Sequence, residues 1–209
     1  MVGKFITIEG TDGSGKTTMT NYIKEYLEKL GYQVIVTREP GGTPFSEKIR
    51  DLILKENIDS KTEALLFAVS RRNHLKNKIL PELEAGKIVI CDRFLDSSIA
   101  YQVYGRGLDE KDVLSINNYI LDGFEPNNTI YYDVDIDLGL SRTRTRDSNN
   151  KMDNEEYNFY INVKKGYDKI AQKNKQRVIT IDANKNLEEV KLETEKVLES
   201  LVEKWKQEK

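Results

Sequence analysis

The sequence predicts an α/β fold in which helices flank an open, parallel, five-stranded sheet. Five short apolar, β-rich runs alternate along the chain with stretches of helical periodicity, which is typical of strands joined by right-handed helical crossovers. The runs contain consecutive apolar residues, so both faces of the sheet are expected to be covered. The five predicted strands are residues 5–9, 33–37, 87–91, 129–134 and 177–181.

Length and composition favour one domain, residues 1–209, with one sizeable core. The net charge of −2 gives no global attraction to nucleic acid, so no nucleic-acid partner is expected. No apolar run approaches the roughly 20 residues that span a bilayer, and no signal peptide precedes the first strand, so no membrane partner is expected. The single cysteine, Cys91, ends an apolar strand and is expected to be a buried thiol in a reducing, cytoplasmic location.

The turn after the first strand carries the most specific motif. Residues 10–17 read Gly-Thr-Asp-Gly-Ser-Gly-Lys-Thr, the P-loop pattern G-x-x-x-x-G-K-[ST]. Such a loop surrounds phosphate oxygens with backbone N–H groups, while Lys16 would contact the β- and γ-phosphates and Thr17 would bind Mg²⁺. The helix predicted from residue 18 to 30 points its positive dipole end at the same phosphates. The predicted ATP-binding residues are Gly10, Thr11, Asp12, Gly13, Ser14, Gly15, Lys16, Thr17 and Thr18.

The second strand and the helix after it add less specific signals. Residues 38–42 read Arg-Glu-Pro-Gly-Gly, a turn that brings the backbone close to another group and places Arg38 at the ligand edge of the sheet. A helix predicted over residues 62–84 places Phe67 and Arg71 one turn apart, where they could stack on a base and hydrogen-bond its edge. Spacing alone favours a core Phe67 and a surface Arg71, and His74 is expected to be solvated.

The third strand ends in a Walker B pattern. An apolar run before Asp92 predicts a carboxylate that holds Mg²⁺ directly or through water. Arg93 could clamp an acceptor phosphate, or it could pair with Asp92. Hydroxyl and amide side chains gather in residues 96–102, where a base could be read.

The fourth strand is followed by a basic cluster. Arg142, Arg144 and Arg146 repel one another unless an anion arrives, and guanidinium groups suit phosphoryl oxygens. The alternative is a solvated face with acidic neighbours such as Asp147. The polar residues that follow, 147–151, are expected to form a mobile flap, within a lid of about residues 141–154. The last helix, about 187–205, carries an apolar stripe that predicts core packing.

Taken together, these segments closely resemble the thymidylate kinase family. Its signatures stand in the family's order over nearly the whole chain, at residues 10–17, 38–42, 62–68, 92–94 and 96–102. The second and the last of these are specific to this family among P-loop kinases. The resemblance implies a P-loop nucleoside monophosphate kinase fold with a short lid. It also implies Mg²⁺-dependent transfer of the ATP γ-phosphoryl group to dTMP, giving dTDP, and a homodimer.

The resemblance also implies how the acceptor is held. Phe67 would stack on thymine, Arg71 would bond its exocyclic oxygen, and Gln102, with Ser98 nearby, would read the ring N–H. Tyr101 would crowd the 2′ position and favour deoxyribose. The substrate-binding residues implied are Asp12, Arg38, Arg50, Phe67, Arg71, Arg93, Ser98, Tyr101 and Gln102.

On the phosphate side, Arg38 and Arg93 would hold the acceptor phosphate, with Arg50 near it, and Asp12 would engage the 3′-hydroxyl side and the metal. Gly13 stands where some eukaryotic members carry a basic residue, so the chain resembles the bacterial type with a basic lid. The catalytic residues implied are Lys16, Arg93, Arg142, Arg144 and Arg146. The metal ligands implied, direct or through water, are Thr17, Asp12 and Asp92.

Two positions depart from the family's common pattern. Phe94 replaces a common Tyr, and Lys151 replaces a common Arg.

Two other functions are alternatives to this one. The nearest alternative is a P-loop kinase for another nucleotide or a nucleoside. A remote alternative is a P-loop GTPase-type switch, for which residues 184–187, Asn-Lys-Asn-Leu, lack the final Asp of the guanine motif.

Overall fold

The computed structural model describes residues 3–143 and 157–207. Its strands form a parallel five-stranded sheet in the order β2-β3-β1-β4-β5. Each predicted strand is confirmed to within one residue at either end. The strands are β1 (Lys4–Glu9), β2 (Val34–Arg38), β3 (Ile88–Asp92), β4 (Asn128–Asp133) and β5 (Val178–Asp182).

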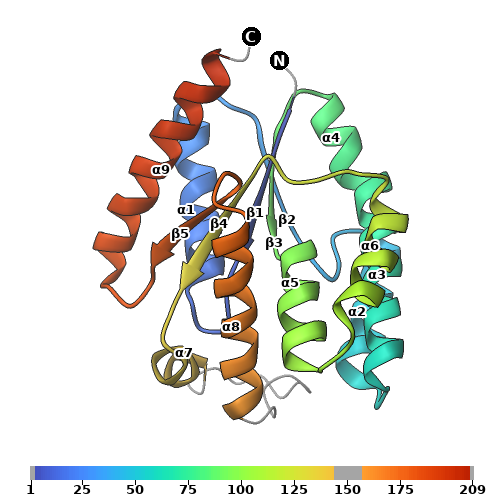
Figure 1. Ribbon diagram of the computed structural model, residues 1–209. Coiled ribbons are helices and arrows are strands. Elements are labelled where there is room, and N and C mark those ends of the chain that lie inside the picture. The colour runs from blue at the N-terminus through green and yellow to red at the C-terminus, as the bar shows by residue number, and fades with distance from the viewer. Residues whose placement is uncertain (1–2, 144–156, 208–209) are drawn as a thin grey trace.

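Helices connect the strands and cover both faces of the sheet (Figure 1). The long helix predicted over residues 62–84 is present, but its middle turns widen into a π-helical segment between two α-helices. The helical segments are α1 (Lys16–Lys29), α2 (Pro44–Lys55), α3 (Ser60–His74), η1 (Leu75–Ile79), α4 (Leu80–Glu84), α5 (Leu95–Ser98), η2 (Ile99–Gly105), α6 (Glu110–Leu121), α7 (Ile136–Thr143), α8 (Tyr157–Lys173) and α9 (Leu187–Gln207).

Alternate side chains of the central strands enter different cores, because successive residues of a strand point to opposite faces. Ile6 and Ile8 of β1 pack on the face that α1 and α9 cover, beside Trp205 of the last helix. Phe5 packs on the opposite face, against the η1 segment and Phe94. Both faces are therefore buried, as the consecutive apolar residues predicted.

The carboxyl ends of the strands meet at the lower edge of Figure 1, where the P-loop and α7 lie. Gly13 of the P-loop and Gly139 of α7 approach closely, since a Cβ on Gly13 would lie 2.0 Å from the Gly139 oxygen. Gly13 also has a φ of 78°, which favours glycine. The start of the predicted lid thus packs against the P-loop as α7, whereas residues 144–156 of that lid lie outside the described residues.

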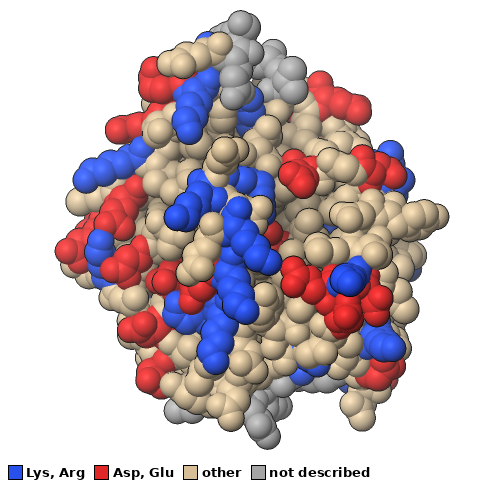
Figure 2. Space-filling view, viewed as in Figure 1, with Lys and Arg blue, Asp and Glu red and all other residues tan. Residues whose placement is uncertain are grey.

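The face that α8 covers carries charges of both signs. Lysine and arginine side chains form a stripe down the middle of this face, over α8, and acidic side chains lie on both sides of it (Figure 2). Among the described helices, none combines the length and the apolar character that crossing a bilayer requires.

Candidate active site

The P-loop places the Lys16 ammonium at the centre of the carboxyl edge. Gly15 precedes α1 in the left-handed region, with a φ of 85°, and the buried ammonium donates a 2.8 Å hydrogen bond to the Thr11 oxygen across the loop. Burial, together with the charge of Arg93, lowers the pKa of Lys16 to about 8. A desolvated ammonium beside a nest of backbone N–H groups is ready to meet an anion.

Asp92 ends β3 with an oxygen that is suited to a cation. Its Oδ1 is buried and has no hydrogen-bond partner among the described residues. An orphaned carboxylate oxygen of this kind costs free energy unless something else contacts it. Thr17 is exposed at the start of α1, so its hydroxyl can be reached from solvent. These oxygens are of the type that Mg²⁺ prefers.

Arg93 joins the P-loop to the neighbouring cavity. Its guanidinium pairs with Asp12 at 2.6 Å and donates to the Gly10 oxygen at 3.0 Å and to the Tyr167 hydroxyl at 3.1 Å. The partner of Arg93 is thus Asp12, and the alternative pair with Asp92 is wrong. Burial alone would raise the pKa of Asp12, but the charges of Arg93 and Lys16 hold it below its usual value.

Glu9 is a site residue that the sequence analysis missed. It ends β1 fully buried, and it accepts hydrogen bonds from the Phe94 N–H, the Ser97 hydroxyl and the Tyr167 hydroxyl at 2.8, 2.6 and 3.0 Å. Burial, with the charge of Asp96, raises the pKa of Glu9 to about 7. Glu9 could have been identified from the sequence, because it is an acidic residue at the end of a largely apolar strand.

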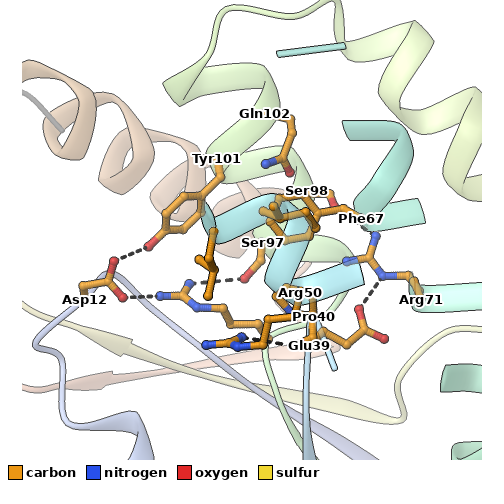
Figure 3. Close-up of a pocket in the computed structure, with 13 residues that line it drawn as sticks. Asp12, Glu39, Pro40, Arg50, Phe67, Arg71, Ser97, Ser98, Tyr101 and Gln102 are labelled. Carbon is orange, nitrogen blue, oxygen red and sulfur yellow. Dashed lines mark hydrogen bonds and ion pairs between the residues drawn. The ribbon is translucent and has the colours of Figure 1, made fainter. Parts of the chain in front are cut away.

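A cavity of about 150 Å³ lies beside the P-loop, at the carboxyl edge of the sheet (Figure 3). It brings together eight of the nine residues that the resemblance assigns to the acceptor, from the P-loop, α2, α3 and residues 93–102. The ninth, Arg38, is exposed and pairs with Glu47 at 2.9 Å. The residues that line the cavity are Asp12, Glu39, Pro40, Arg50, Ile53, Leu54, Phe67, Arg71, Arg93, Ser97, Ser98, Tyr101 and Gln102.

Arg71 is almost fully buried, so the expectation of a surface arginine is wrong. Its Nε donates to Glu39 at 2.7 Å, and its Nη1 donates to Ser98 and Asn117 at 2.9 and 2.5 Å. Its Nη2 donates to the Phe94 oxygen at 2.9 Å. These bonds use four of the five N–H groups of a guanidinium, which leaves one Nη2 proton for a further acceptor. Phe67 is half-buried on the cavity wall, not in the core.

His74 is also buried, and its predicted solvation is wrong. Its Nε2 is 2.7 Å from the Thr37 hydroxyl, and its Nδ1 is 3.0 Å from Glu39. Gly42 passes directly over this pair, because a Cβ there would lie 2.5 Å from His74 Nε2. The Arg-Glu-Pro-Gly-Gly turn therefore closes over the histidine. Cys91, near Glu39 and His74, is buried as predicted.

Gln102 has a buried carboxylate beside it. Its Nε2 donates to Glu63 Oε1 at 3.4 Å, and Arg106 forms two 3.2 Å hydrogen bonds to the two oxygens of Glu63. The Tyr101 hydroxyl donates to Asp12 at 3.4 Å. Glu63 and Glu39 were both missed, since nothing local in the sequence shows that they face polar partners from other segments.

Of the basic cluster, only Arg142 lies within the described residues. Its guanidinium donates to the Ala183 oxygen at 3.1 Å and to the Gly13 oxygen at 3.4 Å, so it reaches the P-loop from α7. Arg144, Arg146 and Lys151 lie outside the described residues. Phe94 is fully buried, with the Arg71 guanidinium 5.2 Å from the centre of its ring.

Comparisons with known proteins identify the family. The thymidylate kinase family profile matches residues 8–194. A thymidylate kinase of Geobacillus sp. (strain WCH70) is 47% identical over 195 residues, 91% of this chain and 93% of that protein. One of Mesoplasma florum is 46% identical over 209 residues, 98% of this chain and 99% of that protein.

The fold has a solved counterpart as well. The crystal structure of thymidylate kinase from Ehrlichia chaffeensis is similar at a TM-score of 0.77 and 40% sequence identity, over 95% of this chain and 99% of that one. Both the family profile and the relatives span nearly the whole chain, from the P-loop strand to the last helix. The chain therefore belongs to the thymidylate kinase family.

Proposed function

We propose that this chain transfers the γ-phosphoryl group of ATP to dTMP, giving dTDP. One observation supports this most strongly. The P-loop adjoins a cavity lined by Phe67, Arg71 and Gln102. Asp12 of the P-loop pairs with Arg93, and both residues also line the cavity. ATP phosphates on the P-loop and a nucleotide in the cavity would therefore meet at Arg93. Membership of the thymidylate kinase family disfavours both alternatives, which are a kinase for another acceptor and a GTPase switch.

The cavity offers the contacts that a thymine base requires. Phe67 supplies an aromatic face, and the remaining Nη2 proton of Arg71 can be donated to an exocyclic carbonyl. Gln102 supplies an amide for the ring N–H, with Ser98 nearby. Tyr101, held by its bond to Asp12, narrows the cavity on the sugar side. Together these groups favour a deoxyribonucleotide with a carbonyl next to the ring N–H.

The transfer needs positioning and charge neutralisation more than acid–base chemistry. The acceptor is already a phosphate anion, so no strong general base is required. Lys16 and Arg93, with Arg142 and the other lid arginines, would offset the repulsion between two anionic nucleotides. Arg50, which donates to the Pro40 oxygen at 3.0 Å, would lie near the acceptor phosphate. Arg38 would have to leave Glu47 to join it.

We propose Mg²⁺ as the cofactor. The orphaned Oδ1 of Asp92 and the exposed Thr17 hydroxyl fit such an ion, with Asp12 in its outer shell. When bound, Mg²⁺ neutralises charge on the β- and γ-phosphates. The residues of this chain then need only to orient the ion and the nucleotide.

A substrate panel tests this function. We expect dTMP to be preferred over dUMP, dCMP and the ribose analogue of dTMP in a coupled ADP-release assay. The gap to dUMP is expected to be modest, because one methyl in an apolar pocket is worth about 1–3 kcal/mol. Chelation of Mg²⁺ with EDTA is expected to abolish ADP release, and added Mg²⁺ to restore it. Equal kcat/KM for dCMP and dTMP would exclude a thymidylate kinase.

We also propose a homodimer, for which an apolar groove gives support. Phe45 of α2, Leu65 and Val69 of α3, and Tyr119 of α6 line it, and each is at least 45% exposed. Apolar side chains that gather on one face of a folded protein mark an interaction surface. Such a face can pair with its own copy about a two-fold axis.

Replacing Leu65 in this groove is expected to break the dimer. Leu65→Arg places a charge in the interface, so the mass by light scattering is expected to fall from about twice the 24.1 kDa chain to that of one chain. Leu192→Arg is the matched control, because Leu192 is comparably exposed on α9, at 56% against 50% for Leu65. A dimer that persists in Leu65→Arg, or dissociates only in the control, would place the interface elsewhere.

We further propose that residues 1–209 form one kinase domain in the cytoplasm. The family profile extends from β1 into α9, which supports one domain. The free, buried thiol of Cys91 suits a reducing compartment.

A further inference from the structure

The amide of Gln102 carries two opposite groups, an accepting oxygen and a donating NH₂. Thymine offers an N–H at ring position 3, so its partner must accept. Cytosine offers a lone pair at the same position, so its partner must donate. A Gln102 that could turn over would satisfy either base. Discrimination between them therefore requires that something fixes the amide.

Glu63 is placed to fix it. Gln102 Nε2 donates to Glu63 Oε1 at 3.4 Å. An ionised carboxylate can only accept hydrogen bonds, so the NH₂ end of Gln102 is the end that can face it. The side chains of Glu63 and Gln102 are only 2% and 1% exposed, and bulk water does not compete for this contact. The amide oxygen is left for a partner on another side, and the amide end of Gln102 is directed toward Phe67 and Ser98 in Figure 3.

Arg106 fixes the position of the Glu63 carboxylate. Its Nε and Nη2 each donate to Glu63 at 3.2 Å, one to each oxygen. Such a fork compensates the charge of a buried carboxylate and fixes its plane. The Arg106 guanidinium is itself held 4.7 Å from the centre of the Phe159 ring, on α8. The chain of contacts thus runs from α8 through Arg106 and Glu63 to Gln102.

We propose that Glu63, held by Arg106, is a positioning residue for base specificity. It orients the Gln102 amide so that the oxygen meets the base N–H, and the pocket then rejects cytosine. This inference rests on the proposed function, because it needs Gln102 to read the base of a nucleoside monophosphate. Neither Glu63 nor Arg106 touches the reacting atoms, since both act through Gln102.

The test is the ratio of kcat/KM for dTMP to that for dCMP in Glu63→Gln. An amide at position 63 can donate as well as accept, so Gln102 is free to turn. We expect the ratio to fall about tenfold, as one mismatched buried hydrogen bond would cause. The ratio of dTMP to dUMP is the internal control and is expected to stay at its wild-type value. Thymine and uracil share the same N–H and carbonyl pattern and differ by one methyl group.

Arg106→Gln is the second variant, in case Glu63→Gln does not fold. Glutamine cannot form the guanidinium fork that fixes the plane of the Glu63 carboxylate. Glu63 then no longer holds the Gln102 amide in one orientation, so the same ratio is expected to fall. Circular dichroism checks the fold of both variants. A wild-type dTMP-to-dCMP ratio in a folded variant, an equal change in both ratios, or loss of fold in both variants overturns the proposal. Wild-type enzyme is measured in the same assay. If the proposed function itself is wrong, the wild-type enzyme shows no preference for dTMP, which distinguishes that failure from failure of the role of Glu63.

Discussion

Replacing Lys16 with alanine is expected to lower kcat by about 10²–10³ and leave the fold intact. The ammonium lies inside the P-loop, where it donates a hydrogen bond to the Thr11 oxygen. It would contact the β- and γ-phosphates, and a preorganised charge in a water-poor site is worth more there than in solution. The loss should therefore fall on kcat more than on the KM for dTMP, since dTMP would be held in the neighbouring cavity.

The fold should survive because Lys16 contributes charge, not packing. Its pKa is lowered to about 8, chiefly by burial, which means that holding the ammonium in the loop has a cost in free energy. Alanine removes that cost. Lys24→Ala is the matched control, because Lys24 lies on the same helix, half-exposed, 3.8 Å from Glu28. Thermal unfolding and steady-state rates of both variants make the comparison. If folded Lys16→Ala turned over at the wild-type rate, the P-loop would have no role in transfer.

The sheet could be predicted because its signal is local. A strand that is buried on both faces has a short apolar run as its sequence signal. The observed strand bounds differ from the predicted ones by at most one residue at each end. The P-loop was predictable for the same reason, since its residues are consecutive. The order β2-β3-β1-β4-β5 could not be read in this way, because it depends on pairings between runs far apart in the chain.

The cavity wall shows where local signals end. Arg71 and His74 look like surface residues on a charged stretch of helix, yet both are buried. Both have Glu39 as a buried polar partner, which accepts from Arg71 Nε and lies 3.0 Å from His74 Nδ1. These contacts join residues 32 and 35 positions apart, so no window of one helix contains them. Spacing offered Arg71 as a base-binding residue but favoured the surface; the family resemblance decided for the site, and it said nothing of His74.

Glu63 illustrates the same limit for specificity. Its partners Gln102 and Arg106 lie 39 and 43 positions away, and from the sequence alone it is one acidic residue in the first turn of a helix. Acidic residues are common there because they favour the helix dipole. The structure is needed to distinguish that ordinary role from a buried carboxylate that faces a base-reading amide.

Arg93→Lys is the second substitution for which we expect a large loss, about 10²–10³ in kcat/KM for dTMP. The guanidinium contacts the Asp12 carboxylate, the Gly10 oxygen and the Tyr167 hydroxyl at the same time. Lysine keeps the charge but offers a single ammonium in place of a planar fork. A lysine side chain cannot bond to the P-loop and to the acceptor nucleotide at the same time. The phosphates of ATP and dTMP would therefore lose the cation that contacts both. Both kcat and the KM for dTMP are expected to change.

The control for Arg93→Lys is the same substitution at a second bidentate arginine. Arg177 donates to both oxygens of Asp96 at 2.8 Å, and it precedes β5, at the opposite edge of the sheet from the P-loop. Arg177→Lys is therefore expected to lower the melting temperature without changing kcat/KM. Losing a guanidinium fork costs stability in both places, but only at Arg93 does the fork lie between the two nucleotides. Equal catalytic losses in the two variants would mean that Arg93 acts through stability alone, and full activity in folded Arg93→Lys would mean that charge without the fork is enough.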